Sequence, residues 1–225
     1  MIRVAISVEG QTEDEFCKRL LVPFFRKKEI EITSIIVTTK RKRCGTKYKG
    51  GCINLDRVKN ELSKLLPNFD YVTTFYDLYG FDIDSNLTAG DIEQKICNLF
   101  NTDKLVPYIQ QYEFETLLFS KPEYFEEYFS DVRAKEKFKE IIKSCGGIEE
   151  INNSKETAPS KRIGKIFRQY DEQYDKVFHG YSIVEDIGLD EILLQCTRFR
   201  QWMERIQNLT KKFSCQDKSE ILGAD

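Results

Sequence analysis

Four short β-rich segments separated by helical patterns fill the first 112 residues, and this alternation restricts the chain to a few folds. Helical spacing of apolar residues over 54–66 and 89–100 predicts connections that cross from one strand to the next. Strands that alternate with helices form an open, mainly parallel sheet flanked by helices, so we expect an α/β fold. The predicted strands are 2–8, 32–39, 71–76 and 105–112.

Strand patterns stop near residue 131, and helical patterns follow over 133–144, 161–170 and 189–211. We therefore expect an α/β domain over residues 1–130 and a helical C-terminal region over 131–225 that packs on it. Phe199 and Trp202 are expected in the core or at a partner interface, because large aromatic side chains at helical spacing are typical of buried positions.

The first helix is predicted to begin just after the first strand. Thr12 followed three residues later by Glu15 matches a capping box, in which each side chain satisfies a free backbone N–H. Phe16, Leu20 and Leu21 would form its apolar face, and Pro23 is expected near its end.

Composition excludes several classes of protein. The chain of 225 residues is 40% hydrophobic and 32% charged, which excludes disordered and collagen-like sequences. Its mean hydropathy is −0.48 and no apolar run approaches the ~20 residues of a membrane span, so no membrane partner is expected. The N-terminus reaches Glu9 too early for a signal peptide, and the seven cysteines lack a C-x-x-C pair. We expect reduced thiols and a cytoplasmic location.

Carboxylates follow three of the four predicted strands. Glu9, Asp77 and Glu113 each stand where a strand ends, and ligands of open α/β sheets bind beyond that edge. Glu115 would share a face with Glu113 if the strand stays extended. Clustered carboxylates repel one another unless a cation neutralises them, and oxygen-only ligands suit Mg²⁺ or Mn²⁺. The competing interpretation is that these acids cap helix N-termini.

Basic residues concentrate in the N-terminal part of the chain. Residues 1–60 carry 14 basic and 7 acidic residues, whereas residues 61–130 carry 4 and 13. A glycine-containing loop over 40–52 holds six cations in ten residues, which could bind the phosphates of a nucleic acid or simply face solvent. These cations are Lys40, Arg41, Lys42, Arg43, Lys47 and Lys49.

A second candidate phosphate contact lies in the helical region. Lys161 and Arg162 stand at a predicted helix start after Pro159, where backbone N–H groups can also hold a phosphate. A simple helix start explains the same residues equally well. His179 is the only histidine, and no nucleophile elbow accompanies it.

Several segments together resemble a known family. Val8-Glu9-Gly10-Gln11-Thr12-Glu13, followed by Phe16 and by Asp77 after a strand, is similar to the TOPRIM domain of topoisomerases, primases and OLD-type nucleases. The wider pattern resembles a bacterial TOPRIM-like family of unknown function, whose members are encoded beside an ABC- or OLD-like ATPase, often in anti-phage defence loci. The matching segments are 76–80, 107–115, 158–163 and 196–202.

The resemblance implies roles for two residues. Glu9 matches the TOPRIM glutamate, and Asp77 matches the first residue of the Asp-x-Asp metal motif. The second motif position is Tyr79, a poor Mg²⁺ ligand while neutral, and Asp82, Asp84 or the Glu113/Glu115 pair would have to supply the missing oxygens.

These observations predict a Mg²⁺-dependent nuclease that acts on DNA or RNA with an ATPase partner. Glu9, Asp77 and Glu113 would be its catalytic residues, with Glu115 as a further metal ligand. The alternative is a catalytically degenerate module that binds nucleic acid or the ATPase without cleavage, which Tyr79 favours. A phosphotransferase fits the same acids, but the chain lacks a G-x-x-x-x-G-K-[ST] nucleotide loop.

Overall fold

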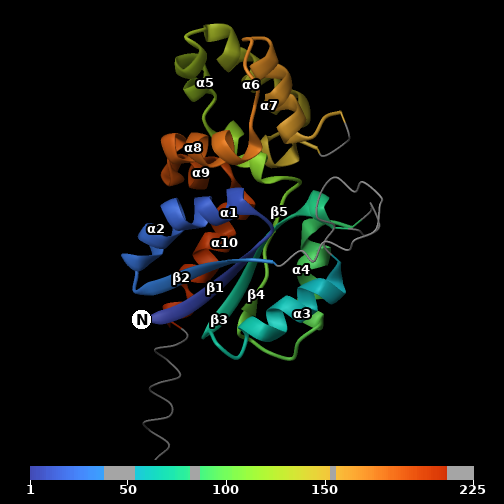
Figure 1. Ribbon diagram of the computed structural model, residues 1–225, viewed down its shortest axis with the longest axis vertical. Coiled ribbons are helices and arrows are strands. Elements are labelled where there is room, and N and C mark those ends of the chain that lie inside the picture. The colour runs from blue at the N-terminus through green and yellow to red at the C-terminus, as the bar shows by residue number, and fades with distance from the viewer. Residues whose placement is uncertain (38–53, 82–86, 153–155, 212–225) are drawn as a thin grey trace, which may run out of the picture.

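The computed structural model describes residues 1–37, 54–81, 87–152 and 156–211. Its centre is a parallel sheet whose strands lie in the order β2-β1-β3-β4, with β5 also pairing with β3 (Figure 1). This confirms the expected α/β class. The strands are β1 (Ile2–Val8), β2 (Ile30–Ile36), β3 (Tyr71–Asp77), β4 (Leu105–Val106) and β5 (Ile109–Gln110).

Helices cover both faces of the sheet. Alternate residues of β1 and β3 point to opposite faces, so that Phe75 packs in one core cluster and Tyr76 in the other. The first cluster receives α1 (Gln11–Phe16), a π-helical segment η1 (Cys17–Leu21), α2 (Val22–Arg26) and α10 (Thr197–Gln207). The second receives α3 (Leu55–Leu65) and α4 (Ala89–Asn98), which confirm the helices predicted there.

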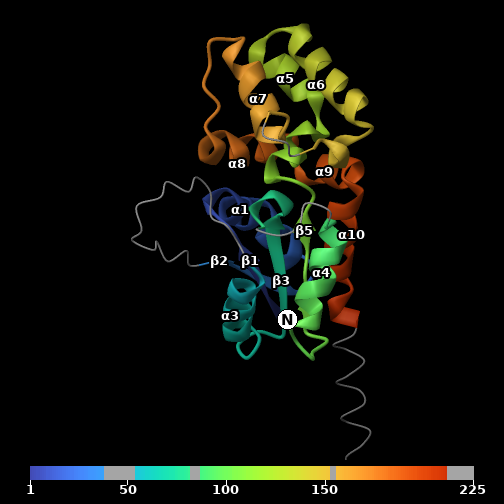
Figure 2. The ribbon, with the colours of Figure 1, turned by 90° about the vertical axis from the view of Figure 1, so that its right-hand side faces the viewer.

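The remaining helices extend the molecule beyond the carboxyl end of the sheet (Figure 1). They are α5 (Pro122–Phe129), α6 (Val132–Cys145), α7 (Pro159–Arg168), α8 (Lys176–Ile187) and α9 (Leu189–Gln195). The last helix, α10, runs back along the sheet (Figure 2). Its Phe199 and Trp202 are buried against β3, as expected for core residues. The boundary between residues 130 and 131 stays a prediction.

Two local expectations were wrong. The segment 105–112 is two short strands, because Pro107 has no N–H to donate and the Thr74 side chain instead bonds both the N–H and the C=O of Tyr108. The segment 189–211 is helical, as predicted, and the extended backbone of Cys196 divides it into two helices. Pro23 lies near the end of the first helical stretch, as expected, because α2 ends at Arg26.

The predicted capping box is the second expectation that was wrong. The N-cap of α1 is Gly10, and no side chain caps the helix. The Thr12 hydroxyl donates instead to the carbonyl of Lys176, 3.5 Å away on α8. Within the described residues, no helix is both long and apolar enough to span a membrane.

Candidate active site

The candidate site lies where the order of the strands reverses. From β1 the chain passes over one face to β2, and from β3 it passes over the other face to β4. In such sheets the helices diverge between the two central strands and leave a crevice at their carboxyl ends, where ligands bind. Glu9 directly follows β1 and Asp77 is the last residue of β3, so both stand at this point.

Glu9 and Asp77 are in direct contact. The Glu9 carboxylate accepts a hydrogen bond of 2.9 Å from the backbone N–H of Asp77. Gly80 also lies close to this carboxylate, since a Cβ at that position would lie 2.6 Å from Glu9 Oε1. Only a residue without a side chain leaves Glu9 its present position.

Two residues that sequence reasoning missed complete the cluster. Glu13 of α1 is buried beside Glu9. Lys176, the first residue of α8, places Nζ 3.0 Å from Glu115 Oε2 and 3.8 Å from Asp77 Oδ2. The resemblance segment that ends at Glu13 was a signal for Glu13. No sequence signal pointed to Lys176, which lies far from the acids along the chain.

Glu113 and Glu115 both lie at this edge of the sheet, but they have different surroundings there. Glu113 follows β5 through Tyr112, whose φ of 64° is in the left-handed region, and its carboxylate accepts a hydrogen bond of 3.0 Å from the N–H of Ser160. That contact caps α7, the competing role considered for such an acid. The strand does not stay extended beyond Glu113, because the 3₁₀ segment η3 (Phe114–Ser120) begins there and buries Glu115 completely.

Burial makes these carboxylates hard to ionise. Burial, with Glu13 nearby, raises the pKa of Glu9 from 4.5 to about 8. Burial raises the pKa of Glu115 to about 7 against the opposing effect of Lys176, and the pKa values of Asp77 and Glu13 are raised for the same reason. Burial therefore outweighs the effect of the Lys176 ammonium group on these four carboxyl groups.

These pKa values predict that the metal-free chain loses stability as the pH rises. The folded state keeps protons on Glu9 and Glu115 up to pH 7 to 8, whereas the unfolded chain releases them near 4.5. Since the folded state binds more protons in this window, the free energy of unfolding should fall between about pH 5 and pH 8. Urea unfolding in EDTA at both ends of the window measures the change.

The Glu115→Gln variant is the control for this titration. It removes one of the titrating groups, so its stability should depend less steeply on pH than that of the wild type. A wild-type stability that is level or rises across the window would contradict the assignment.

The described acids of the cluster supply the type of ligand that a divalent cation prefers, but they are not grouped around one ion position. Asp77 is buried and its Oδ1 has no hydrogen-bond partner, which leaves an oxygen available to a ligand. In the part of the chain that the structure describes, however, no three Asp, Glu, His or Cys side chains are grouped as ligands of one ion. Lys176 lies against Asp77 and Glu115 where a cation would be expected.

The other candidate residues make other contacts or fall outside the described residues. The side chain of Tyr79 is 57% exposed. Arg162 donates through Nε to the carbonyl of Thr157 at 2.7 Å, and Lys161 is exposed at the start of α7. Asp82, Asp84 and the whole basic loop fall outside the described ranges, so their predicted roles stay predictions.

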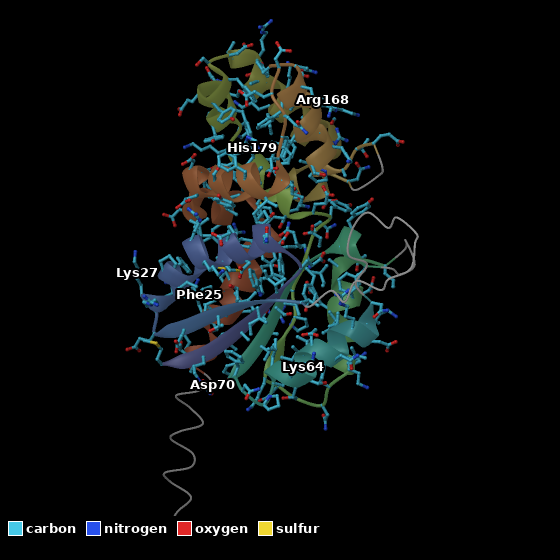
Figure 3. The ribbon with its side chains drawn as sticks, viewed as in Figure 1. Phe25, Lys27, Lys64, Asp70, Arg168 and His179 are labelled. Atoms are coloured by element: carbon cyan, nitrogen blue, oxygen red, sulfur yellow. The ribbon has the colours of Figure 1, made fainter. Side chains whose placement is uncertain are left out.

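His179 lies in the helical region rather than among the acids (Figure 3). Its Nδ1 accepts a hydrogen bond of 2.8 Å from the N–H of Asp175, and its ring stacks on Tyr174. These contacts support the structural role that a lone histidine usually has.

Comparison with known proteins identifies a family but no function. A family model described as a domain of unknown function, DUF4276, matches residues 8–207. Neither the curated proteins nor the solved structures contain a match to this chain. The matched range begins at the end of β1 and includes every member of the acid cluster as well as Lys176. Because the model covers most of the sequence, the chain belongs to the DUF4276 family.

Proposed function

We propose that this chain is a TOPRIM-like, Mg²⁺-dependent nuclease that cleaves DNA or RNA. The observation that carries the proposal is the contact between Glu9 and Asp77 at the carboxyl end of adjacent parallel strands. The TOPRIM resemblance assigns functional roles to the same two positions. A cytoplasmic location and an ABC- or OLD-like ATPase partner, in an anti-phage defence system, belong to the same proposal and rest on the resemblance.

In this proposal the chain positions a divalent cation and the nucleic acid. Glu9 and Asp77 would hold Mg²⁺ or Mn²⁺, with Glu115 and Glu113 near enough to contribute charge. When bound, such a cation activates water and stabilises negative charge on a phosphate. Gly80 leaves room for the Glu9 carboxylate, which a side chain at that position would displace. The cations between Lys40 and Lys49 would bind the phosphate backbone, as the sequence predicts.

A specific observation supports the alternative, a binding module that does not cleave. Tyr79, which is 57% exposed, stands at the second position of the metal motif, where a neutral tyrosine is a poor Mg²⁺ ligand. Lys176 already pairs with two of the acids. A chain of this kind would bind nucleic acid or the ATPase and leave the phosphodiester intact.

The experiment that separates the two functions uses the chain together with the ATPase encoded beside it. Single-stranded and double-stranded DNA and RNA are incubated with the complex and ATP, in Mg²⁺, Mn²⁺ or EDTA. Cleavage that needs the divalent cation supports the nuclease. Binding of nucleic acid without cleavage in any of these conditions supports the alternative.

The Gly80→Ala variant is expected to weaken metal binding without unfolding the chain. The added methyl would push the Glu9 carboxylate away from Asp77, and displaced metal ligands typically lower affinity about tenfold or more. Titration with Mn²⁺ measures the change. Gly90→Ala in α4 is the matched control, because its Cβ would have only an ordinary contact, 3.7 Å from Thr88 Oγ1. Equal Mn²⁺ affinity in both variants would remove Glu9 from the metal site.

A further inference from the structure

Tyr79 is a large aromatic residue that the fold holds outside the core, beside the acids of the candidate site. Its side chain is 57% exposed. It stands two residues after Asp77 and directly before Gly80, the residue that lies against the Glu9 carboxylate. Two residues span at most about 7 Å of backbone, so Tyr79 lies at the same edge of the sheet as these acids.

The backbone around Tyr79 is fixed on both sides. Tyr79 belongs to the 3₁₀ segment η2 (Leu78–Gly80), and its N–H donates to the carbonyl of Tyr112 at 3.0 Å. The N–H of Phe81 donates to the carbonyl of Leu78 at 3.3 Å, and both of these residues pack in the second core cluster. The segment is therefore anchored at its two apolar ends, and the Tyr79 side chain between them stays in contact with solvent.

A single exposed aromatic face suits a nucleobase better than a protein partner. The chain neighbours of Tyr79 do not enlarge its apolar surface, because Leu78 and Phe81 pack in the core and Gly80 has no side chain. A stable protein interface needs roughly 800 Å² from each partner, whereas a base can stack on one aromatic side chain. Only an unpaired base can do so, since its neighbours cover both faces of a base inside a duplex.

We propose that Tyr79 stacks on an unpaired base and makes single-stranded nucleic acid the preferred ligand of this site. The base would belong to a nucleotide at Asp77 or next to it. This inference rests on the proposed function, which makes nucleic acid the ligand. It depends neither on cleavage nor on a bound metal, so it can be measured in EDTA.

The test is the binding of fluorescein-labelled oligothymidylate and oligouridylate, and of an A·T duplex of the same length, to the full chain in EDTA. The chain is used alone and with the ATPase encoded beside it, and fluorescence anisotropy measures the affinity. Tyr79→Ala should weaken single-strand binding about tenfold, the loss typical of one stacked base, and leave duplex binding unchanged. Tyr79→Phe keeps the aromatic face and should match the wild type.

Phe178→Ala is the matched control, because it removes an aromatic side chain that is also exposed, by 61%. Two residues further along α8, Gly180 packs on α1, since a Cβ there would lie 2.7 Å from Thr12 Cγ2. Two residues turn a helix by about 200°, so Phe178 stands on the side of α8 that faces away from α1. Its loss should leave the affinity for both single strands and duplex unchanged.

Each outcome decides the inference. A wild type that binds no single strand, a folded Tyr79→Ala with wild-type affinity, or an equal loss of duplex binding would overturn it. A Tyr79→Phe as weak as Tyr79→Ala would assign the contact to the hydroxyl and overturn the stack. Loss of the ATPase instead of the oligonucleotide would overturn it in favour of a protein contact. If circular dichroism shows that Tyr79→Ala does not fold, Tyr79→Leu replaces it, because leucine is apolar but has no aromatic face.

A fluorescence readout tests the stack directly. In a set of single strands, each with 2-aminopurine at a different position, the base that stacks on an aromatic ring loses fluorescence. Wild type and Tyr79→Phe should quench one position, and Tyr79→Ala should quench none. Quenching by a wild-type complex that does not cleave in Mg²⁺ would keep Tyr79 as the base-binding residue and reject the nuclease. Cleavage by the wild type without quenching at any position would reject the stack and keep the nuclease.

Discussion

Replacing Asp77 with asparagine is expected to abolish Mg²⁺-dependent cleavage and to leave the chain folded. The Asp77 carboxylate is buried, lies 3.8 Å from Lys176 and keeps Oδ1 without a hydrogen-bond partner. Asparagine has nearly the same shape but no charge, so it would hold a divalent cation poorly. Cleavage by the complex with its ATPase, compared between wild type and Asp77→Asn, measures the loss.

Stability should move in the opposite direction from activity. In the absence of metal, burial raises the pKa of Asp77, and the neighbouring charges of Glu13 and Glu9 raise it further. Removing a carboxylate that ionises unfavourably should leave the free energy of unfolding unchanged or higher at pH 8. Urea unfolding in EDTA tests this.

The Asp103→Asn variant is the matched control. Asp103 is an exposed residue just before β4, at the opposite end of the sheet from Asp77, so its loss should affect neither property. Equal cleavage by wild type and Asp77→Asn would show that the chemistry lies elsewhere in the complex.

The site residues that stand at the ends of strands could be predicted from the sequence. A strand buried on both faces appears in the sequence as a run of apolar and β-branched residues, and β1 and β3 are such runs. Parallel strands point their carboxyl ends the same way, so the residues that follow them, Glu9 and Asp77, had to reach the same edge. The contact between the two confirms that they lie together, whereas their binding of a metal remains a proposal.

The site was not predictable where it depends on the packing of helices. Lys176 lies on α8, whose exposed Val177 and Phe178 and internal Gly180 weaken the helical pattern. Sequence periodicity therefore missed the helix. Nothing local indicates that α8 packs on α1, since the close approach at Gly180 depends on the position of Thr12 in space.

Tertiary contacts at the ends of strands and helices explain the remaining differences. The expected alternation of Glu113 and Glu115 assumed that the strand continues, but the chain turns at Tyr112 and enters a 3₁₀ segment. Thr12 and Glu15 match the sequence pattern of a capping box, but the N-cap residue of the helix is Gly10. Such choices depend on tertiary contacts that outweigh local preference.

Replacing Trp202 with alanine should be the most destabilising change in the described core. Its indole stacks on Tyr108 at 4.6 Å between ring centroids and contacts Phe75 and Phe199. The indole N–H donates to Thr73 Oγ1 at 2.8 Å, so the side chain joins α10 to β3. Removing a large buried aromatic residue typically costs about 3–5 kcal/mol of unfolding free energy.

Two variants at this position distinguish the contribution of packing from that of the hydrogen bond. A variant at an exposed position shows how much the loss of apolar surface alone changes the free energy of unfolding. Trp202→Phe keeps an aromatic ring but loses the donor to Thr73, so it should cost less than Trp202→Ala. Leu194→Ala on α9 removes a side chain that is 67% exposed and should change stability by no more than about 0.5 kcal/mol. Urea unfolding followed by far-UV circular dichroism measures all three. If Trp202→Ala unfolded at the same urea concentration as Leu194→Ala, the packing of Trp202, the largest fully buried side chain of the described residues, would not stabilise the sheet.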